Sequence, residues 1–138
     1  MPVRPTLLIA GACLAASAAS PAAAGSPEQL RDAYSLEARA EDPAFAGFSA
    51  ERGSRFFAAR HGREWSCASC HTDNPAGPGK HAATGKAIAP LAPGAGSERF
   101  ASAPKAEKWF RRNCNDVLGR ACSAREKGDV LAWLLTLR

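Results

Sequence analysis

Residues 66–71 read Ser-Cys-Ala-Ser-Cys-His, and this short stretch decides what kind of fold the chain must form. The spacing Cys67-x-x-Cys70-His71 is the attachment signature of a c-type haem. One turn of chain places both thiols along one edge of the porphyrin, where they add to two vinyl groups, and brings the imidazole over the iron. We therefore predict one covalently attached haem c, with His71 as the proximal iron ligand.

Two other uses of a Cys-x-x-Cys pair compete with haem attachment. A structural zinc ion needs four ligands, usually in two close pairs, but the other candidate ligands form no second close pair: His61, His81, Cys114 and Cys122. A redox-active pair usually follows a strand and begins a helix, whereas residues 60–65 are polar and mixed. The sequence therefore favours haem over zinc binding and over thiol redox chemistry.

The N-terminal residues have the pattern of a secretory signal peptide. Arg4 is the only charged residue before Glu28, and residues 7–19 are apolar or small. Residues 22–24 are three alanines, which suit a signal peptidase. The apolar run is too short and too weakly flanked to span a bilayer. We therefore predict a signal peptide that is cleaved after Ala24.

Cleavage at this point gives a signal peptide at residues 1–24 and one exported domain at residues 25–138, which is long enough for a single small core. The chain has a formal net charge of +5, and its basic residues are spread along its length. Nucleic acid is a poor partner for an exported protein, whereas a basic rim can steer an acidic redox protein. We predict a periplasmic monohaem cytochrome c domain without nucleic-acid binding or membrane insertion.

The chain has five cysteines, and the haem motif accounts for only two of them. Cys13 leaves with the signal peptide, although it also allows a weak lipoprotein signal as an alternative. Cys114 and Cys122 remain as an even pair in an oxidising compartment, so we predict a disulfide between them. On the chain-entropy model, closing this short loop contributes about 2.5 kcal/mol to stability.

Outside the haem motif, the chain predicts helices and no strands. Two capping boxes mark helix starts, one for a helix over residues 26–40 and one for a C-terminal helix over residues 123–138. Further helices are expected over residues 49–61 and 105–113. The C-terminal helix is apolar almost all round, so it should be the most buried helix. Residues 73–104, rich in Gly, Pro, Ala and Ser, are expected to wrap the porphyrin.

The order of these elements resembles class I cytochrome c: an early helix, a haem motif, a long loop and an apolar terminal helix. In that fold, a glycine of the early helix allows the terminal helix to cross closely, and an aromatic residue follows the glycine. Gly53 and Phe57 match these places, with residues 130–134 opposite. The predicted fold class is therefore all-α: a class I cytochrome c fold in which the residues before Ser49 form an N-terminal helical extension.

The ligand on the other side of the iron is open at this point. Class I cytochromes c usually use a methionine there, but the only methionine of this chain is Met1, so composition excludes a His/Met haem. A bis-His haem through His81 is one alternative. Another is a residue from the segment before the terminal helix, which contains Asn113 and Asn115. Asn113 also suits a plain structural role at the end of a helix.

Residues 108–120 read Lys-Trp-Phe-Arg-Arg-Asn-Cys-Asn-Asp-Val-Leu-Gly-Arg, and Cys122 follows them. This block resembles a signature of the sphaeroides haem protein family. Members of this family are high-spin class I cytochromes c. Residues 47–53 and 84–93 are similar to the same family. The resemblance implies that Asn113 is the distal ligand of oxidised iron, and that Cys114 pairs with Cys122.

The resemblance also implies a function. Asn113 releases the iron on reduction, ferrous iron then binds oxygen or nitric oxide, and a diheme cytochrome c or another redox protein supplies the electrons. The chemistry is consistent, because an amide oxygen is a hard, weak donor that suits ferric iron better than ferrous iron. The alternative is a plain bis-His electron carrier without gas binding. An enzymatic role is not expected, because no clear general acid accompanies the asparagine.

The remaining haem contacts are predicted from residue type. Lys86 and Arg99 are cations that can pair with the haem propionates, and Trp65 and Trp109 can line the pocket. For the two tryptophans, ordinary packing in the protein core is an equally good interpretation.

Overall fold

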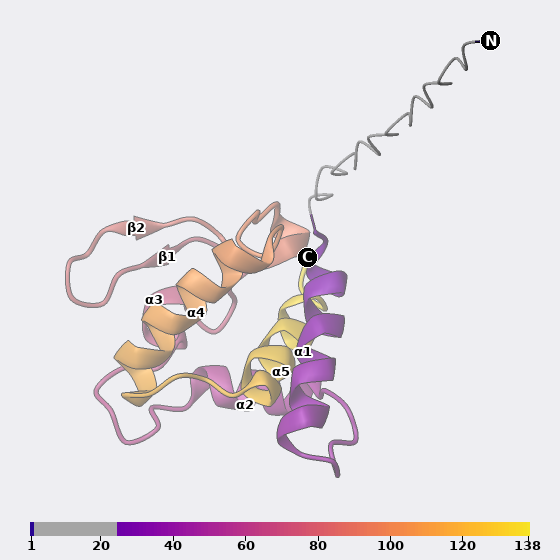
Figure 1. Ribbon diagram of the computed structural model, residues 1–138. Helices are drawn as coiled ribbons and strands as arrows, with labels where there is room; N and C mark the ends of the chain where they lie inside the picture. Colours follow the sequence, from indigo (N-terminus) through magenta and orange to yellow (C-terminus); the bar gives the residue numbers. More distant parts are fainter. Residues whose placement is uncertain (2–24) are drawn as a thin grey trace.

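The computed structural model describes Met1 and residues 25–138 of the chain. The predicted signal peptide and its cleavage point after Ala24 therefore lie outside the described residues, apart from Met1. The regular elements of the described part are almost all helices (Figure 1), and none of these helices is long and apolar enough to cross a membrane. The elements in chain order are α1 (Pro27–Glu41), α2 (Ala50–Ala58), α3 (Ala68–His71), β1 (Gly79–Lys80), β2 (Ala87–Ile88), the 3-10 helix η1 (Pro93–Ala95), α4 (Ala103–Leu118) and α5 (Ala124–Leu134).

Two helices begin at the capping boxes that the sequence predicts. The Ser26 hydroxyl accepts a hydrogen bond from the backbone N–H of Gln29, and the Gln29 side chain accepts one from the backbone N–H of Ser26. Ser123 and Glu126 form the same reciprocal pair at the start of α5. Each pair satisfies two backbone donors that a helix start otherwise leaves without partners. These local interactions explain why the starts of α1 and α5 are readable from the sequence.

Helix α5 is the centre of the fold, and both α1 and α2 pack against it (Figure 1). Most of its residues are buried, as the sequence predicts. The core around it is apolar and draws on α1, α2, α4, α5 and the loop before α4: Leu30, Tyr34, Phe57, Leu91, Phe100, Ala106, Val130, Leu131 and Leu134.

Helices α2 and α5 cross in direct backbone contact at Gly53. A Cβ atom at this position would lie 2.9 Å from the Val130 nitrogen and closer still to the Asp129 carbonyl group. Only glycine therefore fits the crossing. This confirms the role that the class I resemblance implies for Gly53. The crossing places Phe57, one turn further along α2, beside the haem motif.

A buried carboxylate fastens the start of α2 to α5. Asp129 accepts hydrogen bonds from the Ser49 backbone N–H at 2.7 Å and from the Arg52 guanidinium at 2.8 and 2.9 Å. The same guanidinium donates to the Gly47 carbonyl at 2.9 Å. A charge this deeply buried is tolerated only when it is paired and hydrogen-bonded, and here every partner comes from the α2 end of the crossing.

The N-terminal helix α1 is joined to α4 and α5 through Tyr34. The Tyr34 hydroxyl is buried and donates a 2.6 Å hydrogen bond to Glu107 of α4. Lys127 of α5 donates to the same carboxylate at 3.0 Å, and its ammonium lies 4.5 Å from the centroid of the Tyr34 ring. Burial, and then the hydrogen bond to Glu107, raise the pKa of Tyr34. Three helices therefore meet at one carboxylate.

Replacing Tyr34 by phenylalanine should lower the free energy of unfolding by about 1 kcal/mol, because Glu107 loses a buried hydrogen-bond donor while Lys127 still neutralises it. Denaturant unfolding of the holoprotein measures this loss. Leu36→Gln, at a highly exposed position on the same helix, is the matched control and should leave stability unchanged. Equal stabilities for wild type and Tyr34→Phe would show that the hydrogen bond contributes nothing.

The predicted C-terminal helix over residues 123–138 is too long, because α5 ends at Leu134. The structure departs from the sequence prediction in two further places. It contains a small antiparallel hairpin, with Gly79 opposite Ile88 and Lys80 opposite Ala87, where no strand is predicted. Helix α4 is also longer than the predicted helix over residues 105–113. It ends at Gly119, which has a positive φ of 72° and donates its N–H to the Asn115 carbonyl. The interpretation of Asn113 as a helix end is therefore wrong.

Candidate haem site

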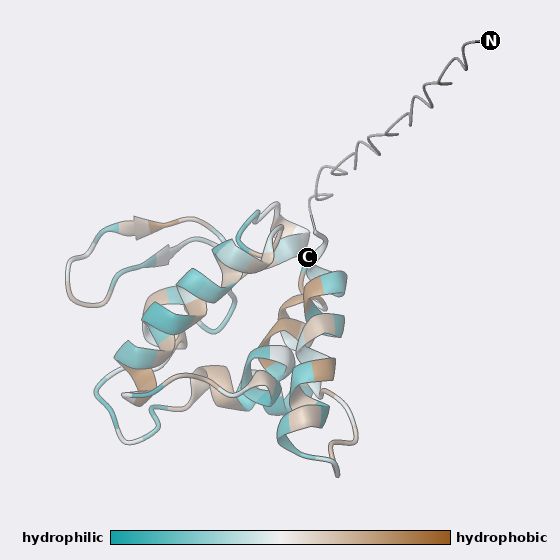
Figure 2. Ribbon diagram, viewed as in Figure 1, coloured by the Kyte–Doolittle hydropathy of each residue, from teal (hydrophilic) through white to brown (hydrophobic). Residues whose placement is uncertain are grey.

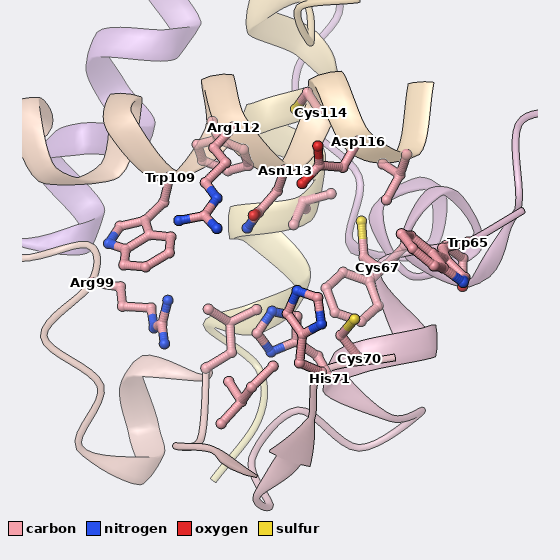
Figure 3. Close-up of a pocket in the computed structure, with 18 of the residues that line it drawn as sticks. Trp65, Cys67, Cys70, His71, Arg99, Trp109, Arg112, Asn113, Cys114 and Asp116 are labelled. Atoms are coloured by element: carbon pink, nitrogen blue, oxygen red, sulfur yellow. The ribbon is translucent and has the colours of Figure 1, made fainter. Parts of the chain in front are cut away.

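A cavity of about 500 Å³ separates α3 and the β hairpin from α4 (Figure 3). The residues that line it come from α2, the haem motif, the hairpin, the loop before α4, α4, the segment after it and α5. The structure brings together every residue that the sequence marks for the haem site, with the two predicted disulfide cysteines beside them: Trp65, Cys67, Cys70, His71, Lys86, Arg99, Trp109, Asn113, Cys114 and Cys122.

The haem motif forms the short helix α3 on one side of this cavity. The backbone N–H groups of Cys70 and His71 both donate to the Cys67 carbonyl, so the motif closes into one turn. Both thiols are unpaired, and Figure 3 shows their sulfurs at the edge of the cavity next to Trp65. A Cβ atom at Gly79 would lie 3.1 Å from the Cα of His71. Strand β1 therefore packs directly against this turn.

The His71 side chain is in the state that an iron ligand requires. The residue is only 8% exposed. Burial, with a smaller contribution from the charge of Arg99, lowers the pKa of His71 to about 4. The imidazole is therefore neutral at physiological pH, and a neutral imidazole is the form that binds metals.

The competing interpretations of the Cys-x-x-Cys pair find no support in this geometry. Burial raises the pKa of Cys67 to about 11, whereas a redox-active thiol needs a lowered pKa. Within residues 25–138, no three His, Cys, Asp or Glu side chains are placed to hold a metal ion together. Two unpaired thiols at one edge and a buried imidazole between apolar walls fit a haem better than either alternative.

Aromatic and aliphatic side chains form the walls of the cavity beside His71. The Phe57 ring centroid lies 6.1 Å from that of His71 and 5.0 Å from that of Trp133. Further apolar lining residues come from the loop before α4, from α4 itself and from α5: Leu91, Phe100, Phe110, Val117, Val130 and Leu134. This apolar lining suits the flat, apolar body of a porphyrin.

Helix α4 forms the opposite side of the cavity. Trp109, Arg112, Asn113, Asp116 and Val117 share one face, since they are three to four residues apart along the helix. Figure 3 shows the Asn113 side chain pointing from α4 into the cavity, toward the side that carries His71.

A disulfide holds the chain next to Asn113. Cys114 and Cys122 are bonded in the structure, with an S–S distance of 2.01 Å. The bond joins the last turns of α4 to the segment just before α5. The backbone at Asn113 is thus held by the helix and by the disulfide, so only rotation of its side chain is needed to move the amide into or out of the cavity.

His81 also lines the cavity, but its loop is attached to the α3 side. The Ala82 backbone N–H lies 3.3 Å from the Cys70 sulfur, and the His81 Nδ1 accepts from the N–H groups of Ala83 and Thr84, each at 3.3 Å. Since α3 also carries His71, a ligand from this loop must pass round the porphyrin edge to reach the other face. Asn113 comes from the opposite wall and meets no such obstacle.

The remaining candidate ligands lie away from the cavity. Asn115 is exposed and does not line it, although it neighbours Asn113 in the sequence. His61 is exposed as well, and its ring lies against the Phe56 ring and carbonyl.

Basic side chains gather at the edge of the cavity away from the two cysteine sulfurs. Figure 3 shows Arg99, Trp109 and Arg112 on that side, and the Arg99 guanidinium lies 4.4 Å from the centroid of the Trp109 ring. Burial lowers the pKa of Arg99. The propionates of a haem lie on the edge opposite its vinyl groups, so cations are well placed here. Lys86 lines the cavity from the hairpin.

The sequence does not predict Arg112 or Asp116 as cavity residues. Both follow from helix periodicity once Asn113 is known to lie inside α4, because they flank it on the same face as Trp109. Helix periodicity in the sequence could therefore have identified Arg112 within the predicted helix, whereas Asp116 requires recognising that the helix continues to Gly119.

Comparison with known proteins shows that most of the chain is similar to c-type cytochromes. Residues 43–134 match the family model described as a domain of unknown function (DUF1924). The cytochrome c-type protein SHP of Cereibacter sphaeroides is 46% identical over 127 residues, which cover 88% of this chain and 93% of that protein. Cytochrome c'' of Methylophilus methylotrophus is 42% identical over 113 residues, which cover 79% of this chain and 78% of that protein.

Solved structures of the same two proteins share the fold. Oxidised cytochrome c'' of Methylophilus methylotrophus superimposes with a TM-score of 0.72 at 41% identity, covering 81% of this chain and 94% of that one. Oxidised SHP, described as an oxygen-binding cytochrome c, superimposes with a TM-score of 0.71 at 41% identity, covering 81% of this chain and 97% of that one. The elements that line the cavity, from α2 to α5, all lie within the matched region.

Proposed function

Since this chain belongs to the family of SHP and cytochrome c'' and is therefore a c-type cytochrome that carries haem c, we propose that it couples electron transfer to reversible binding of a diatomic gas, oxygen or nitric oxide. The observation that supports this most directly is the shared cavity, which His71 and Asn113 enter from opposite walls. A cavity with two such different donors suits an iron centre with one permanent and one removable ligand.

The proposed haem site uses the predicted residues in separate roles. Cys67 and Cys70 form the thioether bonds, His71 is the proximal iron ligand, and Asn113 is the distal ligand of the oxidised state. Lys86 and Arg99 pair with the propionates, and Trp65 and Trp109 line the pocket. When bound, the haem supplies a one-electron redox centre and an iron position for a gas ligand.

The proposed switch depends on how an amide binds iron. The Asn113 side-chain oxygen is a neutral, hard and weak donor, so it holds ferric iron better than the softer ferrous iron. On reduction the side chain leaves, while the disulfide at Cys114 keeps the helix in place. The NH2 group of the Asn113 side chain can then donate a hydrogen bond to a gas molecule in the vacated position. A solution structure of cytochrome c'' is described in terms of haem-ligand detachment in that protein, which supports a removable ligand here.

The proposal includes a location and a partner. Residues 1–24 are a signal peptide, residues 25–138 form one domain, and the mature protein acts in the periplasm. A diheme cytochrome c or another redox protein supplies the electrons. We propose a role in electron transfer and ligand binding rather than in enzymatic turnover.

The reduced holoprotein should show a high-spin, five-coordinate absorption spectrum and bind carbon monoxide rapidly. The alternative function, a bis-His electron carrier, predicts a low-spin six-coordinate ferrous spectrum without carbon monoxide uptake. Stopped-flow spectroscopy of the dithionite-reduced protein separates these outcomes. His81→Ala is the matched control, and it should change carbon monoxide affinity by less than about twofold. If carbon monoxide binds the reduced His81→Ala variant but not the wild type, the bis-His carrier is the correct function.

A further inference from the structure

A row of basic side chains runs along α4 on the side that faces solvent. The α4 basic face, as we call it, consists of Lys105, Lys108, Arg111 and Arg112. Lys108 lies three residues from Lys105 and Arg111 and four from Arg112, so the four share one side of the helix. All four are exposed. Figure 2 shows the hydrophilic character of α4 in this view. Arg112 stands at the border of this face, where it also lines the haem cavity.

These four cations have no acidic partner within the described residues. By contrast, other basic residues of the chain do form ion pairs: Arg52 with Asp129, Arg55 with Glu51, Arg120 with Glu126, and Lys127 with Glu37 and Glu107. Glu107 lies in the same part of α4, but it faces α1 and α5, where Tyr34 and Lys127 bind it. The positive charges of Lys105, Lys108 and Arg111 are therefore presented to solvent without an ion-pair partner among the described residues.

This arrangement does not stabilise the helix. Like charges three or four residues apart repel each other by about 0.2–0.5 kcal/mol per pair, and Lys108 has such neighbours in Lys105, Arg111 and Arg112. An acidic surface laid against the helix would remove this repulsion. The same helix carries Trp109 and Asn113 into the haem cavity, so a protein bound to it lies near the basic edge of the haem site.

We propose that the α4 basic face is the docking surface for an electron-transfer protein with a cluster of carboxylates beside its own redox centre. The proposal rests on the electron-transfer function proposed above and adds the place where the partner binds. One electron passes from the reduced partner to the ferric haem, and no bond forms or breaks between the two proteins. Charge complementarity of this kind mainly raises the association rate.

A second group of cations supplies the control for this assignment. Arg60 and Arg63 are exposed and lie in the turn just before the haem motif, on the chain segment that leads to the thiols. A partner that docks at the thiol edge of the haem would use this pair. The charge change of Arg60→Glu with Arg63→Glu equals that of Lys108→Glu with Arg111→Glu, so the two double variants differ only in where the charge is reversed.

The test uses the holoprotein and reduced flavodoxin, an acidic electron-transfer protein, as the probe. Stopped-flow absorbance gives the second-order rate constant for haem reduction as a function of ionic strength. For wild type the rate constant should fall as salt is added. Lys108→Glu/Arg111→Glu should lower it about tenfold at low ionic strength and flatten its salt dependence, while Arg60→Glu/Arg63→Glu should stay within about twofold of wild type.

Two results would overturn the proposal. One is an equal or larger loss in the Arg60/Arg63 double variant, and the other is a wild-type rate constant that does not change with salt. NMR titration of the wild-type chain with oxidised flavodoxin is a check without substitutions, and it should shift the amide signals of residues 105–112. Carbon monoxide binding by the same variants should equal that of wild type. If the wild-type protein does not bind carbon monoxide, the proposed gas-binding function is wrong, but the docking surface is still tested by the reduction rates.

Discussion

Replacing Asn113 by alanine should leave the distal position of the oxidised haem empty or occupied by water. The side chain enters the cavity from α4, opposite the wall that carries His71, and alanine offers no donor atom at that place. The ferric absorption spectrum should therefore change to a high-spin form. Azide should bind the ferric variant at least about tenfold more tightly than it binds wild type, because it no longer competes with an internal ligand.

The same substitution should have a much smaller effect on the reduced protein. If Asn113 has already left ferrous iron in the wild type, carbon monoxide affinity of the two proteins should differ only through the lost NH2 donor, by about tenfold at most. Asn115→Ala is the matched control, since Asn115 is exposed and lies outside the cavity. An unchanged ferric spectrum in Asn113→Ala would show that Asn113 is not the iron ligand and would favour His81 in that role.

Gly53→Ala should cause the largest loss of stability among single substitutions in the helical core. The added methyl group would lie 2.9 Å from the backbone nitrogen of Val130 and closer to the carbonyl of Asp129. These are backbone atoms of the central helix, so they cannot rotate away as a side chain does. We expect a loss of about 3 kcal/mol in the free energy of unfolding of the holoprotein, at the upper end for overpacked cores.

The effect of Gly53→Ala should also reach the haem site. Phe57, one turn further along α2, is buried beside His71, so a displaced α2 disturbs the proximal wall of the cavity. Ser54→Ala, at the next position but away from the backbone crossing, is the control and should change stability by less than about 0.5 kcal/mol. Denaturant unfolding and the near-ultraviolet circular dichroism of the two variants report both effects. Equal stability for Gly53→Ala and wild type would show that the helices do not cross in backbone contact.

Features that depend on a few neighbouring residues were the ones that could be predicted from the sequence. The capping boxes at Ser26 and Ser123 mark helix starts correctly, because both partners of each hydrogen-bonded pair lie within four residues. The haem motif has the same local character, since its spacing alone sets the turn that brings two thiols and an imidazole together. Gly53 required the resemblance to class I cytochromes c, because its partner Asp129 is distant in the sequence.

Features that depend on distant packing were harder to predict. The run Asn113-Cys114-Asn115-Asp116 has weak helix propensity, yet α4 continues through it, where Cys114 and Val117 are buried and the disulfide ties it to the segment before α5. Burial outweighs local propensity here, which is why the predicted helix ended too early. Asp116, which lies beyond the predicted helix end, was missed as a cavity residue for the same reason. The two-residue strands of the hairpin are too short to leave a periodic pattern.

The junction at Tyr34 makes the N-terminal helix a determinant of the iron site. Helix α1 ends before residue 43, where the match to the family model begins, yet its tyrosine binds Glu107 on the helix that also carries Asn113. The position of Asn113, the proposed distal ligand, in the cavity is therefore set in part by residues outside the matched domain. Members of this family with the same cavity residues but a different N-terminal helix should consequently differ in how readily the distal ligand leaves the iron.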